Sequence, residues 1–259
     1  MKKSTLFLVL LACSLAAKAQ VNEPISNHKL VIYQLLPRYF GNTNATNKLY
    51  GSKEENGVGK FNDITPKALQ ELKKLGVNYV WYTGVVEHAT MTDYSAYGIK
   101  QDDPDIVKGK AGSPYAIKDY YDVDPDLAVD VKNRMEEYQN LINRTHAEGL
   151  KMIMDFIPNH VARTYQSDAK PAGVIDFGAQ DDKTKAYSPQ NDYYYIPEKN
   201  FVVPAGTEAG GAQFSHPLKD GKFDENPAKV TGNNVFSEKP SIDDWYETMK
   251  LNYGYDLQN

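Results

Sequence analysis

The sequence predicts an α/β fold built on a parallel sheet, and three observations along residues 31–157 support this. Short apolar runs at residues 31–37, 77–86 and 150–157 show little polar alternation, which is typical of strands buried on both faces. Two helical patterns separate these runs. Strands joined through helices run parallel with right-handed crossovers. The order strand, helix, strand, helix, strand therefore indicates the beginning of a (β/α) barrel or of a doubly wound sheet.

Both predicted helices have recognisable ends. The first begins at Thr65 and Pro66, which supply an N-cap and a first-turn proline, and it ends at Gly76. The second ends at Gly149. Its apolar stripe comprises Val131, Met135, Tyr138, Leu141 and Ile142.

The regular pattern stops after the third predicted strand. Residues 158–240 are rich in Gly, Pro, Asp, Asn and Tyr and carry no amphipathic stripe, so we expect a long irregular insertion. It follows the carboxyl end of a strand, where parallel-sheet enzymes build their active sites. Three strands and an insertion would leave open sheet edges, and we therefore expect the chain to be an incomplete fragment of a larger domain.

The N-terminus reads as a signal peptide over residues 1–19. Lys2 and Lys3 precede an apolar run at residues 6–11, and Ala-Lys-Ala precedes Gln20. The run is too short to span a membrane, so we expect export to the periplasm or the cell exterior. The alternative is a lipoprotein anchored through Cys13. Since Cys13 is the one cysteine, cleavage after residue 19 would leave no thiol for disulfides or catalysis.

The charge and the motifs exclude several functions. The formal charge is −5, and removing three leader lysines would make it −8. With no concentrated basic run, the chain lacks the electrostatic footprint of a nucleic-acid-binding protein. No G-x-G-x-x-G opens a helix, which disfavours a doubly wound nucleotide-binding domain. The sequence does not indicate an oligomeric state.

The densest polar motif is D-F-I-P-N-H at residues 155–160. Asp155 closes a predicted buried strand, and Asn159 and His160 open the loop beyond it. Burying Asp155 would require a partner, because an unpaired buried carboxylate is costly. Taken alone, the motif favours a structural role, in which Asp155 holds a neighbouring strand and His160 caps a loop, over a binding site.

This motif resembles the first conserved motif of the alpha-amylase family, Asp-x-x-x-Asn-His at the end of barrel strand three. Other segments are similar to the family in the same order: IYQLLPRYF, GVGKFNDITPKALQELKKLGVNYVWYTGVVEH and GSPYAIKDYYDVDPDLA. The resemblance implies a (β/α)8 TIM barrel, of which residues 20–160 form the first three β/α units. It further implies an irregular inserted domain B at residues 161–245 and a return to the barrel at residues 246–259.

The resemblance also implies site residues. Tyr115 would stack on the sugar next to the scissile bond, and His160 would hydrogen-bond the hydroxyls of that sugar. Asp155 would support the active site by orienting an arginine on the fourth strand. Asn159 matches a position that ligates a structural calcium in many members, and an amide oxygen suits Ca²⁺.

A second oxygen-rich segment lies in the loop after the first predicted strand. Asn42, Asn44 and Asn47 precede Glu54 and Glu55. These residues could ligate a cation, although a solvated cluster of turns is the favoured interpretation.

Two departures from the family limit what the chain itself can do. Ser113 and Pro114 stand where many members have His-Gly before the tyrosine. Retaining glycosidases also need two carboxylates about 5 Å apart, which in the family follow strands four and five, and no Gly-Phe-Arg-x-Asp occurs here. Glu87, Asp93 and Asp155 lie near the predicted rim, but nothing in the sequence pairs them. No catalytic residue is therefore assigned.

The resulting hypothesis is a retaining glycoside hydrolase acting on alpha-glucosidic linkages of starch-like glucans or maltooligosaccharides. The alternatives are a noncatalytic glycan-binding fragment, a glucosyl transferase or isomerase of the same family, and an inactive product of a truncated gene.

Overall fold

The computed structural model describes residues 29–207 and 215–259, and residues 31–259 form one unit. The predicted signal peptide at residues 1–19, with Cys13, lies outside the described residues. Within the described part of the chain, no helix has both the length and the apolar character that a membrane crossing requires.

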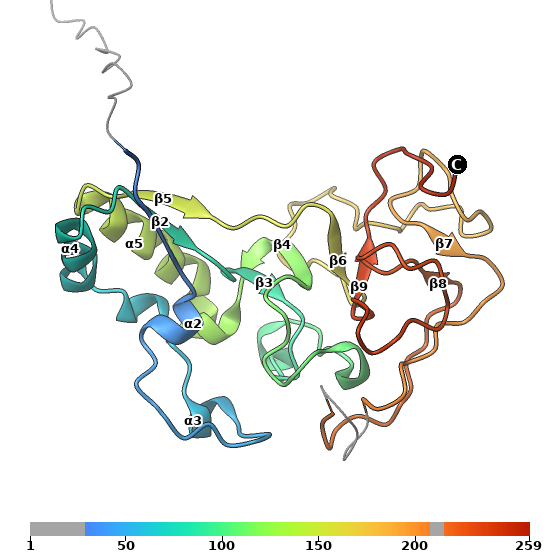
Figure 1. Ribbon diagram of the computed structural model, residues 1–259, viewed down its shortest axis with the longest axis horizontal. Helices are drawn as coiled ribbons and strands as arrows, with labels where there is room; N and C mark the ends of the chain where they lie inside the picture. The colour runs from blue at the N-terminus through green and yellow to red at the C-terminus, as the bar shows by residue number, and fades with distance from the viewer. Residues whose placement is uncertain (1–28, 208–214) are drawn as a thin grey trace, which may run out of the picture. The chain divides into compact units, whose positions relative to one another are not determined.

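A three-stranded parallel sheet forms the centre of the N-terminal half (Figure 1). It consists of β1 (Ile32–Leu35), β2 (Tyr79–Tyr82) and β5 (Lys151–Met154), in the order β1-β2-β5. In register, Ile32 lies beside Tyr79, and Tyr79 beside Lys151. The predicted α/β class and parallel strand order are confirmed.

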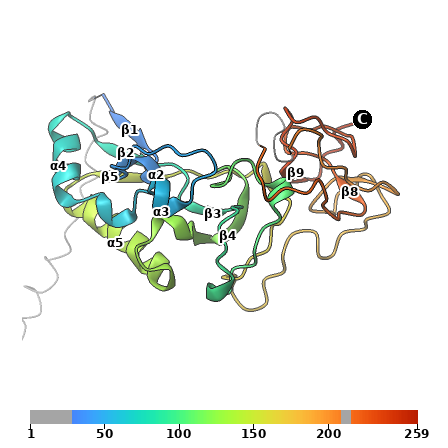
Figure 2. The ribbon, with the colours of Figure 1, turned by 90° about the horizontal axis from the view of Figure 1, so that it is seen from below.

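Two helices connect these strands and pack beside the sheet (Figure 2). Helix α4 (Pro66–Lys74) begins as predicted, because the Thr65 side chain accepts a hydrogen bond from the Ala68 amide at 3.2 Å. Helix α5 (Arg134–Ala147) begins one turn later than its apolar stripe suggests. Val131 instead lies in a 3₁₀ turn capped by the Asp130 side chain.

The core lies where the helices cover the sheet. Tyr82 is fully buried, and its hydroxyl shares a 2.7 Å hydrogen bond with Thr145 of α5. The prediction that all three strands are buried on both faces is wrong for the two edge strands, since Ile32 is 51% exposed and Met154 42% exposed. Met135 of the predicted stripe is likewise exposed. The main core residues are Leu35, Phe61, Ile64, Leu69, Leu72, Val80, Tyr82, Leu127, Tyr138, Leu141 and Leu150.

The second predicted strand is divided in two. After β2 the chain turns at Gly84, whose φ of +73° is readily adopted only by glycine, and continues as β3 (Val86–His88). Strand β3 pairs antiparallel with β4 (Ile117–Val123), with register shifts on both sides of Glu87. The continuous strand predicted at residues 77–86 is therefore wrong beyond Tyr82.

The segment after β5 is largely irregular, as its composition predicts. Strand β6 (His160–Ala162) pairs antiparallel with β9 (Thr248–Lys250), and β7 (Tyr195–Ile196) pairs with β8 (Ala228–Lys229). The β6–β9 pairing brings residues 248–250 beside the beginning of the insertion, and the predicted domain limits stay predictions.

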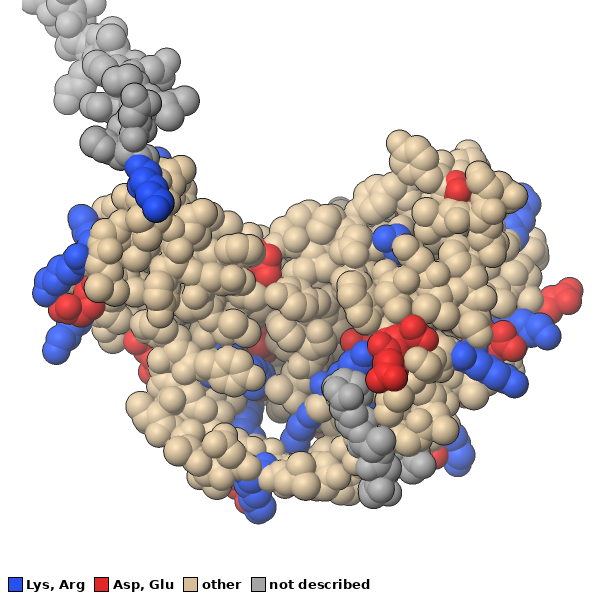
Figure 3. Space-filling view, in the orientation of Figure 1, with Lys and Arg blue, Asp and Glu red and all other residues tan. Residues whose placement is uncertain are grey.

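The remaining elements are short. They are α2 (Pro37–Phe40), α3 (Lys53–Asn56) and the 3₁₀ helices Phe61–Asp63, Ser95–Tyr97, Pro104–Ile106, Pro125–Leu127 and Val131–Asn133. On the face drawn in Figure 3, Lys and Arg side chains are scattered among acidic ones and form no continuous basic patch.

Candidate functional site

A pocket of about 520 Å³ lies beyond the carboxyl end of β5, between the loop before β4 and the β6–β9 pair. Its volume falls within the roughly 300–1,000 Å³ typical of small-molecule sites. The lining residues are Lys108, Ser113, Tyr115, Phe156, Ile157, Pro158, Asn159, His160, Trp245, Glu247 and Thr248.

Three of the four site residues predicted from the sequence meet in this pocket: Tyr115, Asn159 and His160. Tyr115 comes from the loop before β4 and is 45% exposed, so its ring is accessible to a ligand. His160 begins β6 and is 5% exposed. Chain segments far apart in sequence therefore place an aromatic face beside an imidazole.

Trp245 is a pocket residue that sequence reasoning missed. Its ring centroid lies 5.1 Å from that of His160, at an interplanar angle of 52°. It lines the pocket and is 43% exposed. The available signal was a tryptophan at the predicted end of the insertion, but only the β6–β9 pairing shows that this end returns to His160.

His160 is held in its neutral form. Burial, with a smaller contribution from the nearby Lys250 ammonium, lowers the pKa of His160 to about 4. Its Nδ1 atom is buried without a hydrogen-bond partner among the described residues. A neutral imidazole has one nitrogen that donates and one that accepts a hydrogen bond, and sugar hydroxyls do both.

Among the described residues that line the pocket, Glu247 is the one that carries a carboxylate. Burial raises its pKa, and the nearby Lys108 ammonium opposes that rise. The Lys108 Nζ atom lies 3.2 Å from Glu247 Oε2 and donates a 2.7 Å hydrogen bond to the Asp244 carbonyl. This carboxylate is therefore already paired with a cation.

Asp155 does not line the pocket. It follows β5, where its amide donates a 3.1 Å hydrogen bond to the Tyr82 carbonyl. The expectation that it is buried is wrong, because the residue is only half-buried. Its proposed support of an arginine stays a prediction.

The surroundings of Asn159 do not fit the calcium site that the resemblance implies. Its backbone carbonyl oxygen accepts a 3.1 Å hydrogen bond from the Leu251 amide, which leaves only the side-chain amide oxygen as a ligand from this residue. Among the described residues that line the pocket, Glu247 supplies the one carboxylate, and it is paired with the Lys108 ammonium, whereas Ca²⁺ takes six to eight oxygen ligands. Calcium at Asn159 stays a prediction that rests on the resemblance alone.

The asparagine-rich loop borders a second pocket, of about 620 Å³. Its side chains hold the loop itself: Asn42 Oδ1 accepts from the Asn44 amide at 3.0 Å, and Asn44 Oδ1 from the Thr46 amide at 2.8 Å. Asn44 Nδ2 donates to the Glu55 carbonyl at 2.7 Å. These contacts agree with the favoured interpretation, a cluster of turns.

The other carboxylates predicted near the rim lie apart from the pocket lining. Asp93 is exposed and accepts a 2.8 Å hydrogen bond from the Ser95 amide. Glu87 is buried beside Asp119 and Asp168, and sequence reasoning had assigned these last two residues no role.

Comparison with known proteins identifies the family. The family model described as "Alpha amylase, catalytic domain" matches residues 34–247. The chain belongs to the alpha-amylase family, which confirms the resemblance found in the sequence.

Two relatives and one solved structure illustrate the similarity. The trehalose-6-phosphate hydrolase of Bacillus subtilis (strain 168) is 27% identical over 199 residues, which are 75% of this chain and 27% of that protein. The oligo-1,6-glucosidase of Parageobacillus thermoglucosidasius is 28% identical over 180 residues, 69% of this chain and 24% of that protein. The structure of a maltogenic alpha-amylase from Thermotoga neapolitana is 26% identical, covers 52% of this chain and 25% of its own, and has a TM-score of 0.36. The chain spans about a quarter of the length of each.

Proposed function

We propose that this chain is the sugar-binding, N-terminal portion of an alpha-amylase-family hydrolase that acts on alpha-glucosidic linkages of starch-like glucans or maltooligosaccharides. In this proposal, β1, β2 and β5 with α4 and α5 are the first units of a (β/α)8 barrel. The observation that carries the proposal is the pocket in which Tyr115, His160 and Trp245 meet.

The pocket has the chemistry that a glucosyl unit requires. A pyranose ring has an apolar C–H face, which packs on the exposed rings of Tyr115 and Trp245. Its hydroxyl groups donate and accept hydrogen bonds, and His160, Asn159 and Ser113 offer partners for them. An uncharged ligand also matches a pocket whose carboxylate, Glu247, is already paired.

Hydrolysis with retention of configuration is proposed for the whole protein. That mechanism needs a nucleophile and a general acid/base about 5 Å apart. Glu247, in contact with Lys108, is not assigned either role. The names of the two relatives, a trehalose-6-phosphate hydrolase and an oligo-1,6-glucosidase, support a hydrolytic reaction on glucosides.

Binding by the intact chain tests the proposal. Calorimetric titration with maltotriose is expected to show binding, and cellotriose, with the opposite anomeric linkage, to bind more weakly. Tyr115→Ala should weaken maltotriose binding by about tenfold, a loss of roughly 1.4 kcal/mol. The matched control is Tyr121→Ala, which removes a 43% exposed tyrosine of β4 outside the pocket lining. Equal effects of the two substitutions would refute the assignment of the pocket.

A noncatalytic glycan-binding role is the second candidate, and the cation-paired Glu247 favours it. Reducing-sugar release from maltooligosaccharides, measured on the preparation used for titration, separates the two. Binding with release supports hydrolysis, binding alone supports the second candidate, and longer glucans among the products would indicate a transferase.

We also propose export, on the basis of residues 1–19. N-terminal sequencing of the secreted protein should begin at Gln20. A mature protein that begins at an acylated Cys13 would support the lipoprotein alternative.

A further inference from the structure

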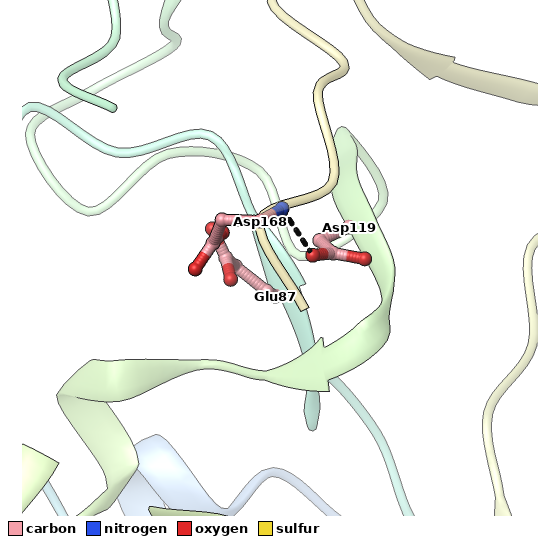
Figure 4. Close-up of side chains that lie close together, drawn as sticks. All are labelled: Glu87, Asp119 and Asp168. Carbon is pink, nitrogen blue, oxygen red and sulfur yellow. Dashed lines mark hydrogen bonds between the residues drawn. The ribbon is translucent and has the colours of Figure 1, made fainter. Parts of the chain in front are cut away.

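Three acidic side chains converge beside the β3–β4 pair, outside the sugar pocket. Glu87 comes from β3, Asp119 from β4 and Asp168 from the loop after β6 (Figure 4). One carboxylate oxygen from each lies within 4.8 Å of the others. The cluster therefore joins the β3–β4 pair to the inserted segment.

Glu87 stands out within this cluster. It is 1% exposed, and both its carboxylate oxygens are buried with no hydrogen-bond partner among the described residues. By contrast, Asp119 Oδ1 accepts from the Tyr121 amide at 2.8 Å, and its Oδ2 accepts from the Asp168 and Ala169 amides at 3.0 and 3.1 Å. An unpartnered buried carboxylate is costly, so the Glu87 oxygens point to a group that completes the site.

The nearby cations balance the cluster only in part. Arg134 directs its guanidinium mainly to Asp122, with Nε 2.9 and 2.8 Å from the two carboxylate oxygens, and forms a longer ion pair of 3.8 Å with Asp168. Lys118 pairs with Asp102 at 3.2 Å. Neither cation forms an ion pair with Glu87 or Asp119, so the three carboxyl groups outnumber the described cations paired with them.

We propose that Glu87, Asp119 and Asp168 form a calcium-binding site. Ca²⁺ binds carboxylate oxygens at about 2.3–2.6 Å, so opposite ligands lie up to roughly 5 Å apart, which accommodates the spacing within the cluster. The ion would take both partner-free oxygens of Glu87 and one oxygen each from Asp119 and Asp168. Water and neighbouring oxygen atoms would complete its coordination.

The consequence is structural. An ion held by β3, β4 and the loop at Asp168 would fasten the inserted segment to the strands that precede α5. This site differs from the one implied at Asn159, because it offers three carboxylates and Asn159 lies in a pocket with an ammonium group.

The test is a calcium titration of the intact chain after chelator treatment and dialysis. Calorimetry should detect a site in the wild type that Glu87→Gln and Asp168→Asn each weaken by at least about tenfold. The matched control is Asp224→Asn, which neutralises an exposed carboxylate outside the cluster and should leave the affinity within about twofold. Unchanged affinity in the Glu87 variant would overturn the proposal.

A second measurement separates a cation site from a merely protonated glutamic acid. Glu87→Gln has almost the same shape and cannot ionise, so the variant should fold and, without calcium, melt at or above the wild-type temperature. Calcium should raise the melting temperature of the wild type and not that of Glu87→Gln. A wild type whose melting temperature is unaffected by calcium would show that a proton alone neutralises Glu87. Magnesium in place of calcium tests the choice of ion, and a preference for magnesium would refute calcium.

Discussion

The ring of His160, at the first residue of β6, lies 5.1 Å from the ring of Trp245, just before β9. The two residues stand near opposite ends of the insertion, and the antiparallel β6–β9 register, in which His160 lies beside Lys250, brings them together. The two ends of the insertion thus meet at the pocket proposed to bind sugar, and both ends line it.

Trp245→Ala should weaken maltotriose binding by about tenfold, because it removes an aromatic face against which the sugar packs. Trp245→Phe should restore most of the loss, since a smaller ring remains at the same position. Calorimetric titration measures both variants. Tyr97→Ala, at an aromatic residue that is 41% exposed and outside the pocket lining, is the control and should bind as the wild type does. A Trp245→Ala variant with wild-type affinity would show that this ring does not contact sugar.

The lowered pKa of His160 predicts how binding depends on pH. Because the folded pKa of about 4 lies below the unfolded value of 6.5, the unfolded chain binds more protons between these values. The contribution of the His160 imidazole to the free energy of unfolding is therefore fully present above about pH 6.5 and is lost as pH falls toward about 4. Sugar affinity should consequently be flat between about pH 6 and 8, since His160 stays neutral there.

Lys250→Gln tests the cause of this shift. Removing the ammonium should raise the pKa of His160 only in part, because burial is the larger contribution. An NMR titration of the imidazole ring proton measures the pKa directly. If the pKa of His160 returned fully to 6.5 in this variant, Lys250 and not burial would be the main cause of the shift.

A buried ion pair between Arg163 and Glu225 holds the insertion together. The Arg163 guanidinium lies 3.9 Å from the centroid of Phe201, and its Nη2 donates a 3.2 Å hydrogen bond to the Lys229 carbonyl. Glu225→Ala should destabilise the chain by about 3–5 kcal/mol, because it leaves a buried guanidinium without its counter-ion.

Urea denaturation measures this loss. The double variant Arg163→Met with Glu225→Leu should recover only part of it, since apolar groups need no counter-ion but Lys229, which pairs with Glu225 at 3.1 Å, still loses its partner. Asp220→Ala, in an exposed pair with Lys222 at 3.9 Å, should change stability by less than about 0.5 kcal/mol. Similar losses at the exposed and buried positions would contradict the argument.

The sequence predicted what depends on local patterns. The cap at Thr65 and the alternation of strands with helices marked β1, α4, β2 and β5 in the correct order. The break at Gly84 was missed, because the apolar run continues through a residue whose positive φ leaves no trace in hydropathy. The exposure of Ile32 and Met154 depends on what covers an edge strand, which periodicity does not encode.

The same distinction between local patterns and long-range pairing applies to the residues of the candidate site. Tyr115, Asn159 and His160 could be found because motifs mark them, whereas Trp245 reaches the pocket through a pairing between segments far apart in sequence. The same holds for the acidic cluster. Glu87 was visible as a carboxylate after a strand, but its neighbours Asp119 and Asp168 come from separate segments that only the folded chain places side by side.

Glu87 makes the stability of the chain depend on pH in a direction that is unusual for a carboxyl group. Burial, followed by the nearby Asp168, raises the pKa of Glu87 to about 9, from an ordinary value of 4.5. Between these values the folded chain binds a proton that the unfolded chain has released. Without calcium, the contribution of the Glu87 carboxyl to the free energy of unfolding is therefore fully present below about pH 4.5 and is lost as pH rises toward about 9.

Glu87→Gln removes this ionisation, so in chelator its melting temperature should fall less than that of the wild type between about pH 5 and 9. Thermal unfolding by circular dichroism at several pH values measures the difference, and Asp224→Asn should follow the wild type. Calcium should favour the ionised carboxylate and offset the alkaline loss in the wild type, because metal ligands bind in their deprotonated form. If the melting temperatures of the wild type and of Glu87→Gln changed with pH in the same way in chelator, Glu87 would be ionised in the folded chain without calcium. A group other than a proton would then neutralise it.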